Sequence, residues 1–83
     1  MKVSLSTHAI KDIRALDPII RQRVVKKIED IEHDRAVPEP LAGELAGIWK
    51  VYVGLKWRIL LEVSPDHKTA LIIRVAPRRE SYR

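Results

Sequence analysis

The apolar residues of this 83-residue chain change their spacing once, and that change limits the folds that the chain can adopt. Up to about residue 32 they recur every three to four positions, which is the spacing of one face of a helix. From residue 48 they alternate with polar residues, which is typical of strands with one buried face. A helical half followed by an alternating half predicts an α+β domain whose two parts share one core.

The helical half carries start signals for two helices after a short first strand. Residues 2–5 (KVSL) alternate and predict that strand, and Ser6 or Thr7 can cap the first helix. Asp17 followed by Pro18 predicts a second helix, because aspartate is a good N-cap and proline is favoured at the first helical position. Two helices joined this closely predict an αα-hairpin. The two apolar stripes are Ala9, Ile10, Ile13 and Leu16, then Ile20, Val24, Ile28 and Ile31.

The alternating half predicts three consecutive strands. Residues 36–47 contain two prolines and two glycines, which break any regular period, so we predict a connector there. Turns near residues 54–56 and 64–67 divide the remaining chain into three strands. We expect an N-terminal strand, the αα-hairpin and a three-strand antiparallel meander in one antiparallel sheet, with the helices packed on one face, in a single domain spanning residues 1–83. The strand residues facing the helices would be Trp49, Val51, Val53, Ile59, Leu61, Val63, Leu71, Ile73 and Val75.

The uncovered face of this sheet should be basic. Residues 1–47 hold eight Lys/Arg and eight Asp/Glu, whereas residues 48–83 hold eight Lys/Arg and three Asp/Glu, so the whole excess of +5 lies in the second half. A one-sided basic field favours a nucleic acid or another polyanion as partner. The residues expected on the open face are Lys50, Tyr52, Arg58 and Arg74, with Leu60 and Ile72 as apolar neighbours.

Several classes of site and location are disfavoured by composition. The three histidines lack metal-ligand spacing and the three glycines form no phosphate-binding loop, so we expect neither a metal nor a cofactor. The absence of cysteine removes disulfides and suits a reducing compartment. The start has no apolar signal segment, and no stretch approaches the roughly 20 apolar residues of a membrane span. We therefore expect a cytoplasmic protein that does not contact a membrane.

The chain closes on four arginines and a tyrosine in its last ten residues, RVAPRRESYR. Arginine suits RNA cleavage, because its planar fork matches two phosphate oxygens and stays charged while negative charge builds up on them. Tyrosine and lysine titrate near pH 10, so a role as general base requires a pKa lowered by neighbouring positive charge. The same cluster would also bind RNA or DNA without any chemistry.

Two motifs in order carry a family resemblance. GIWKVYVGLKWRILLEV followed by RVAPRRESYR resembles the RelE/ParE superfamily of bacterial and archaeal toxins, and STHAIKDIRAL with the second helix extends the likeness over nearly the whole chain. The resemblance to the RelE-like branch implies a ribosome-dependent mRNA endonuclease that a cognate antitoxin holds inactive. It implies metal-independent attack of the 2′-hydroxyl on the scissile phosphate.

The resemblance also implies roles for single residues. Lys50 matches the basic residue of the family's second strand, Arg58 the arginine that opens the third, Arg78 the arginine after the last strand, and Tyr82 the C-terminal tyrosine. The arginines would hold the phosphate, while Lys50 and Tyr82 would transfer protons or stack on a base. A plainer alternative for Arg58 is an ion pair with Glu62 on its own strand. The further residues expected to bind RNA are Tyr52, Lys56, Arg74, Arg79 and Arg83.

Three departures from the family pattern stand out. Tyr52 occupies the place of a second basic residue, which removes one candidate base and leaves a phenol. Leu61 replaces a common tyrosine, and Ala76 with Pro77 replaces a common Gly-His. The turn after Gly54 is one residue longer than usual.

The partners implied by the resemblance are an acidic, amphipathic, RelB-like antitoxin, and mRNA in the A site of the 70S ribosome. A hetero-oligomer of toxin and antitoxin on operator DNA also fits it. Two alternatives remain open from the sequence: a ParE-like toxin that inhibits DNA gyrase, and a non-catalytic module that only binds nucleic acid or its antitoxin.

Overall fold

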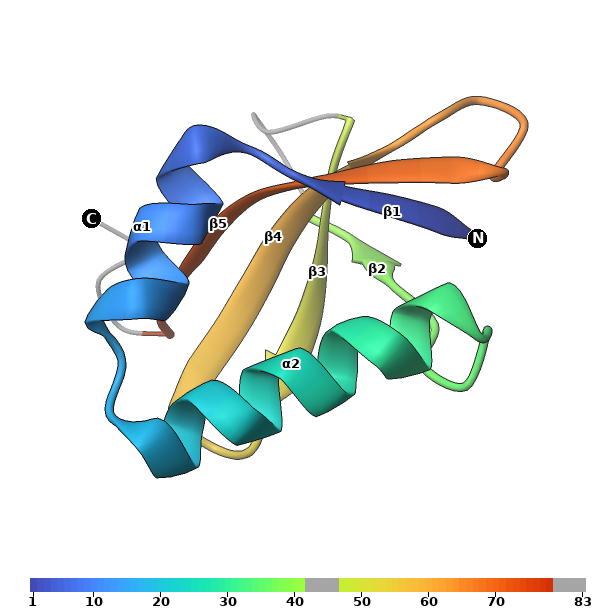
Figure 1. Ribbon diagram of the computed structural model, residues 1–83. Coiled ribbons are helices and arrows are strands. Elements are labelled where there is room, and N and C mark those ends of the chain that lie inside the picture. The colour runs from blue at the N-terminus through green and yellow to red at the C-terminus, as the bar shows by residue number, and fades with distance from the viewer. Residues whose placement is uncertain (42–46, 79–83) are drawn as a thin grey trace.

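The computed structural model describes residues 1–41 and 47–78, in which two helices lie against a five-stranded sheet (Figure 1). This arrangement confirms the α+β class and the order of elements expected from the sequence. The strand order in the sheet is β1-β5-β4-β3-β2. The elements are β1 (Lys2–Leu5), α1 (Thr7–Ala15), α2 (Pro18–Glu32), β2 (Glu39–Pro40), β3 (Ile48–Val53), β4 (Trp57–Val63) and β5 (Thr69–Pro77).

The sheet is mixed, which corrects the expectation of a wholly antiparallel one. β3, β4 and β5 form the predicted antiparallel meander. β1 joins the edge of β5 in the parallel direction, with Lys2 opposite Thr69. Parallel neighbours need a long connection between them, and here both helices and the rest of the sheet lie between β1 and β5 in the chain. Alternation along residues 2–5 indicates a strand but not the direction in which it joins a sheet.

The opposite edge holds a strand that we predicted as part of the connector. β2 pairs with β3 through Glu39 opposite Lys50 and Pro40 opposite Trp49, and the Leu41 N–H donates to the Ile48 carbonyl at 2.9 Å. Proline is compatible with an edge strand, because the side of the strand that faces solvent needs no N–H group to bond another strand. The prolines therefore mark a sheet edge as well as an interruption of helical structure.

Both predicted helix starts are confirmed by capping hydrogen bonds. The Ser6 hydroxyl accepts from the Ala9 N–H at 3.0 Å and donates to the Ile73 carbonyl at 2.9 Å, which ties the start of α1 to β5. The Asp17 carboxylate accepts from the N–H groups of Ile19 and Ile20 at 3.0 and 3.1 Å, with proline at the first helical position. Neither helix in the described part of the chain is long and apolar enough to cross a membrane.

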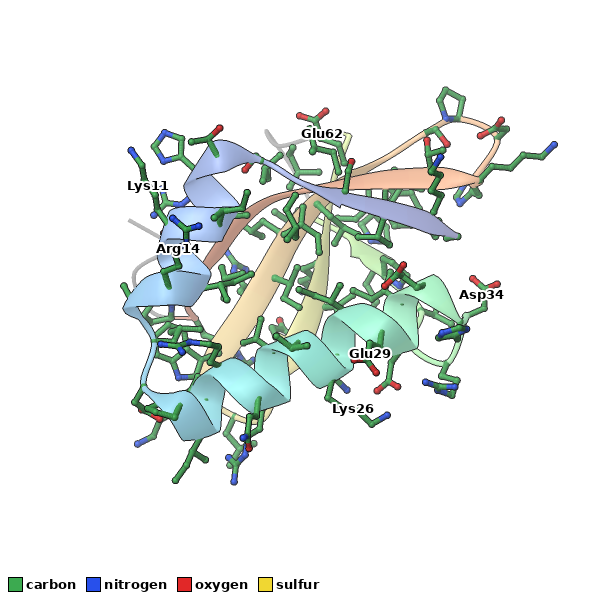
Figure 2. All side chains as sticks on the ribbon, in the orientation of Figure 1. Lys11, Arg14, Lys26, Glu29, Asp34 and Glu62 are labelled. Carbon is green, nitrogen blue, oxygen red and sulfur yellow. The ribbon has the colours of Figure 1, made fainter. Side chains whose placement is uncertain are left out.

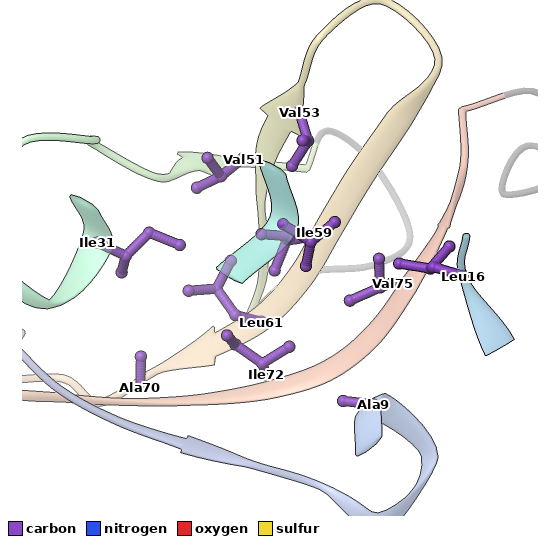
Figure 3. Packing of buried hydrophobic residues seen from close by; sticks show 11 residues of the cluster. Ala9, Leu16, Ile31, Val51, Val53, Ile59, Leu61, Ala70, Ile72 and Val75 are labelled. Carbon is purple, nitrogen blue, oxygen red and sulfur yellow. The ribbon is translucent and has the colours of Figure 1, made fainter. Parts of the chain in front are cut away.

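The core lies between the helices and one face of the meander (Figure 3). Val24 and Ile31 of α2 are fully buried, and Ile20 and Ile28 pack against the core from the same helix, as the stripe predicted. Labelled charged side chains such as Lys26 project outwards from the helices (Figure 2). The buried hydrophobic residues are Ala9, Leu16, Val24, Ile31, Val51, Val53, Ile59, Leu61, Ala70, Ile72 and Val75.

The phase of β5 differs from our prediction over half of its length. We expected Leu71 and Ile73 to face the core and Ile72 to lie on the open face, but Ile72 is 0% exposed and Leu71 is 37% exposed. The pairing of β4 with β5 shifts at Leu60 and Leu61, which lie opposite Arg74 and Ile72. Ile73 is thus an extra residue, and such a bulge reverses the inward and outward faces on one side of it. Strict alternation extended from Val75 towards the N-terminus therefore assigns Ile72 and Leu71 to the wrong faces.

Beyond the last residue that pairs with β1, the edge of β5 is covered by α1. β1 pairs with β5 only as far as Ile72, and Figure 1 shows α1 alongside the next part of β5. The carboxylate of Asp12 accepts from the Val75 N–H at 2.9 Å and from the Arg74 Nε at 2.9 Å. One helical carboxylate thus replaces a missing strand as the partner of an edge N–H group.

We expect Asp12→Ala to lower the free energy of unfolding by about 1–3 kcal/mol, because it leaves a part-buried N–H without its acceptor. Arg74→Ala should cost less than about 1 kcal/mol, since the Arg74 side chain is 51% exposed. Urea unfolding followed by circular dichroism compares the two variants. Equal losses would mean that the ion pair, and not the bond to the backbone, carries the contribution of Asp12.

Candidate functional site

The face of the sheet opposite the core brings three predicted site residues together. Tyr52 on β3 lies directly opposite Arg58 on β4, and Lys50 lies two residues before Tyr52. Residues paired across strands, or two apart along one strand, share a face. Val51, which lies between Lys50 and Tyr52, and its partner Ile59 are buried in the core. Lys50, Tyr52 and Arg58 thus lie on the open face of the sheet, as expected.

Arg78 joins this group from the end of β5. The strand ends at Pro77, and Arg78 continues the pairing by one residue because its N–H donates to the Lys56 carbonyl at 2.9 Å. Ala76, two residues earlier, lies opposite Arg58. The alternation of β5 therefore directs the Arg78 side chain to the face that carries Arg58 and Tyr52.

The ring of Tyr52 lies near two cations. The Cζ atom of Arg78 is 4.0 Å from the ring centroid, and the Nζ atom of Lys50 is 5.0 Å from it. Both distances fall within the range of cation–π attraction, in which the electron-rich ring face offsets part of the repulsion between like charges. The Arg78 Nη1 also donates a long hydrogen bond of 3.4 Å to the Leu55 carbonyl. We call Lys50, Tyr52, Arg58 and Arg78 the open-face cluster.

Arg58 is the deepest member of the open-face cluster. It is 1% exposed, and it is the one charged residue that is buried within residues 1–41 and 47–78. The alternative ion pair with Glu62 is disfavoured, because four residues of strand separate the two Cα atoms by about 13 Å. Glu62 is also exposed, whereas Arg58 is buried. A buried guanidinium acts through a lower effective dielectric than an exposed one, so its charge is felt more strongly by its neighbours.

The other predicted RNA-binding residues are placed differently. Lys56 is exposed in the turn between β3 and β4, next to the backbone of Arg78. Arg74 lies opposite Leu60, as expected for the open face, but its guanidinium reaches Asp12 on α1. That ion pair engages the Arg74 guanidinium within the protein. Tyr82, Arg79 and Arg83 lie outside the described residues.

Sequence reasoning missed the contact between Tyr52 and Arg78. It treated Tyr52 as the loss of a basic residue and Arg78 as part of a tail, although the two residues share a face. The signal was present in the alternation, because Arg78 continues the phase of Ala76 beyond the strand. The missing step was the register that sets Ala76 against Arg58, and Arg58 against Tyr52.

The carboxyls with shifted pKa values lie outside the open-face cluster. Hydrogen bonds from Lys26 and Arg35 lower the pKa of Asp30 on α2. A hydrogen bond from Ser64 and another from the Lys68 N–H lower the pKa of Asp66 in the turn between β4 and β5. Within the described part of the chain no three histidine, cysteine or acidic side chains gather as a metal site would require. The chemistry that the cluster itself offers is that of cations and a phenol.

Solved structures share this fold along most of the chain. The toxin-antitoxin complex RelBE2 from Mycobacterium tuberculosis contains a chain that is 35% identical, with a TM-score of 0.77, and the match covers 93% of this chain and 96% of that one. The isolated RelE toxin of E. coli is 21% identical, with a TM-score of 0.71, over 98% of this chain and 89% of that one. The second likeness is one of fold.

Sequence comparison identifies the family. Toxin RelG of Mycobacterium tuberculosis (strain ATCC 25618 / H37Rv) is 34% identical over 83 residues, which cover 98% of this chain and 94% of RelG. Residues 3–82 match the family described as the ParE toxin of the type II toxin-antitoxin system, parDE. This chain therefore belongs to the RelE/ParE superfamily, the toxins of type II toxin-antitoxin systems.

Proposed function

We propose that this toxin is a ribosome-dependent endoribonuclease that cuts mRNA in the A site. The observation that carries the proposal is the open-face cluster, in which the Arg78 guanidinium lies 4.0 Å from the Tyr52 ring on the face shared with Lys50 and Arg58. Three cations on one sheet face suit a single phosphate that gains charge during reaction. An activity on ribosomes also places the toxin in the cytoplasm.

The proposed reaction is an internal transfer at phosphorus. The 2′-hydroxyl oxygen attacks the adjacent phosphorus, the bond to the 5′ oxygen breaks, and the products are a 2′,3′-cyclic phosphate and a 5′-hydroxyl. A base takes the proton of the 2′-hydroxyl, and an acid gives a proton to the leaving 5′ oxygen. Lys50 and Tyr82 are the proposed carriers of these two protons.

The arginines stabilise the charge that builds up on the non-bridging oxygens. Arg78 is partly exposed and presents its fork to a phosphate, whereas Arg58 is 1% exposed and acts from beneath the surface. Cations that are in place before the substrate arrives lower the barrier to cleavage more than cations that must first be ordered. The ribosome supplies the remaining positioning by holding the mRNA.

A ParE-like toxin that inhibits DNA gyrase is the second candidate, because the matching family is described as a ParE toxin. Such a toxin would need the cluster only for binding. The two candidates differ in what is damaged first in a growing cell.

We expect brief expression of the toxin to halt translation, with new mRNA 5′ ends inside translated coding regions. Primer extension on several transcripts checks this. A transcript whose start codon has been removed is the matched control, and it should stay intact because no ribosome delivers it. Intact mRNA together with arrested DNA replication would support the gyrase candidate instead.

Arg78→Ala should slow single-turnover cleavage on programmed ribosomes by roughly 10²-fold or more, since it removes a donor to the developing charge.

Tyr82→Phe should slow the same cleavage by about 10²–10⁴-fold if the phenol transfers a proton, with ribosome affinity nearly unchanged. If Tyr82 only stacks on a base, phenylalanine should replace it almost fully while Tyr82→Ala weakens binding. Lys68→Ala removes a charge in the turn between β4 and β5 and serves as control. Wild-type rates for both Arg78→Ala and Tyr82→Ala would refute the site assignment.

The surface beside α2 suits an acidic, amphipathic antitoxin of the RelB type. Ile19 on α2 is 65% exposed and Leu55 in the turn after β3 is 87% exposed. Two adjoining hollows between these segments share Arg23, Val53 and Gly54. Exposed apolar side chains with a basic rim favour a partner that brings apolar anchors and negative charge. Structural relatives from Pyrococcus horikoshii and Methanococcus jannaschii are solved as RelE–RelB complexes. A toxin-antitoxin hetero-oligomer on operator DNA is part of the same proposal.

Co-expression of the antitoxin encoded beside this toxin should suppress toxicity and raise the melting temperature of the toxin, because a partner that binds only the folded state stabilises it.

Ile19→Glu should weaken the toxin-antitoxin complex at least about 10-fold by placing a charge against an apolar anchor. Val37→Glu changes another exposed apolar residue, which lies outside the two hollows, and is the matched control. Titration calorimetry gives both affinities. Equal affinities for Ile19→Glu and wild type would place the antitoxin elsewhere.

A further inference from the structure

We infer that Tyr52 is a positioning residue, whose ring rather than its hydroxyl holds the Arg78 guanidinium over the open face of the sheet. The inference rests on the proposed function, in that Arg78 is taken to meet the scissile phosphate. It assigns a role to one of the positions where this chain departs from the family pattern.

Tyr52 lies inside a paired strand, whereas Arg78 lies just beyond the end of one. It lies within the six-residue strand β3, between the buried residues Val51 and Val53, and pairs with Arg58 on the central strand β4. Arg78 follows the last residue of β5, and its side chain makes a hydrogen bond of 3.4 Å to Leu55, near the upper limit for such a bond. The position of the ring is therefore set by the sheet, and the ring lies 4.0 Å from the guanidinium that it would orient.

The aromatic ring also answers an electrostatic problem. A lysine or arginine at position 52 would add a fourth positive charge beside Lys50, Arg58 and Arg78, whereas the face of a phenol ring attracts cations. Lys50 lies 5.0 Å from the same ring. Tyrosine at this place thus brings cations together that would otherwise repel each other, and leaves proton transfer to other groups.

Such a role depends on the ring and makes a specific prediction about its partner. A positioning residue loses its effect when the residue that it positions is absent, so the effects of Tyr52 and Arg78 should not add. A general base would act through its hydroxyl, independently of whether Arg78 is present. Removing the hydroxyl oxygen of Tyr52 therefore distinguishes a general base from a positioning residue, and so does one double variant.

The first experiment measures single-turnover cleavage on programmed ribosomes for Tyr52→Phe, Tyr52→Leu, Arg78→Ala and the double variant Tyr52→Leu with Arg78→Ala. Tyr52→Phe should keep at least about a third of the wild-type rate constant, while Tyr52→Leu should lose about 10-fold or more with the half-saturating ribosome concentration changed less than about threefold. The double variant should be no slower than Arg78→Ala alone. A loss of about 10²-fold in Tyr52→Phe, or losses that multiply in the double variant, would overturn the inference.

The second experiment does not depend on cleavage. Urea unfolding of the wild type, Tyr52→Leu, Arg78→Ala and the double variant should show a coupling of about two- to fivefold in the unfolding equilibrium constant, as expected for a cation–π contact at a partly exposed site. The pair of Tyr52→Leu with Lys68→Ala should be additive and is the control. Coupling without any cleavage by the wild type would leave the contact intact and refute the proposed function. Absence of coupling would refute the inference, whatever the cleavage rates are.

Discussion

The burial of one face of the β3–β4–β5 meander is the constraint on which the rest of this structure depends. Val51, Ile59 and Leu61 must be covered, and α2 supplies Val24 and Ile31 to cover them. Because side chains in a strand alternate, burying one set of residues fixes the other set on the opposite face. Lys50, Arg58 and Arg78 share that opposite face as a consequence of making a core.

This constraint explains which parts of the fold the sequence predicts. The caps Ser6 and Asp17 and the apolar stripe of α2 depend on local chemistry, and each is confirmed. The phase of β5 was wrong because an extra residue, Ile73, shifts the pairing, and nothing in the composition of residues 69–77 marks a bulge. β2 was missed because its two residues gain strand geometry only from their pairing with β3.

The site was predictable to a similar extent. Lys50, Tyr52 and Arg58 share a face through alternation alone, and the structure places them so. The burial of Arg58 and the ion pair of Arg74 with Asp12 arise only in the folded chain, so no local pattern indicated them. The contact of Arg78 with Tyr52 depends on the register of three strands. The predictions for Tyr82, Arg79 and Arg83 lie outside the described residues and stay predictions.

The proposed chemistry requires the open-face cluster to promote attack by a 2′-hydroxyl on its own phosphate, and one atom of the substrate tests it. Programmed ribosomes carrying mRNA with a single 2′-deoxynucleotide at the scissile position can be compared with the all-ribose mRNA in single-turnover cleavage. We expect the ribose mRNA to yield a 2′,3′-cyclic phosphate and a 5′-hydroxyl, while the deoxy mRNA stays whole at that position. Cleavage of the deoxy mRNA at the same phosphate, or products ending in a 3′-hydroxyl and a 5′-phosphate, would contradict the proposed chemistry.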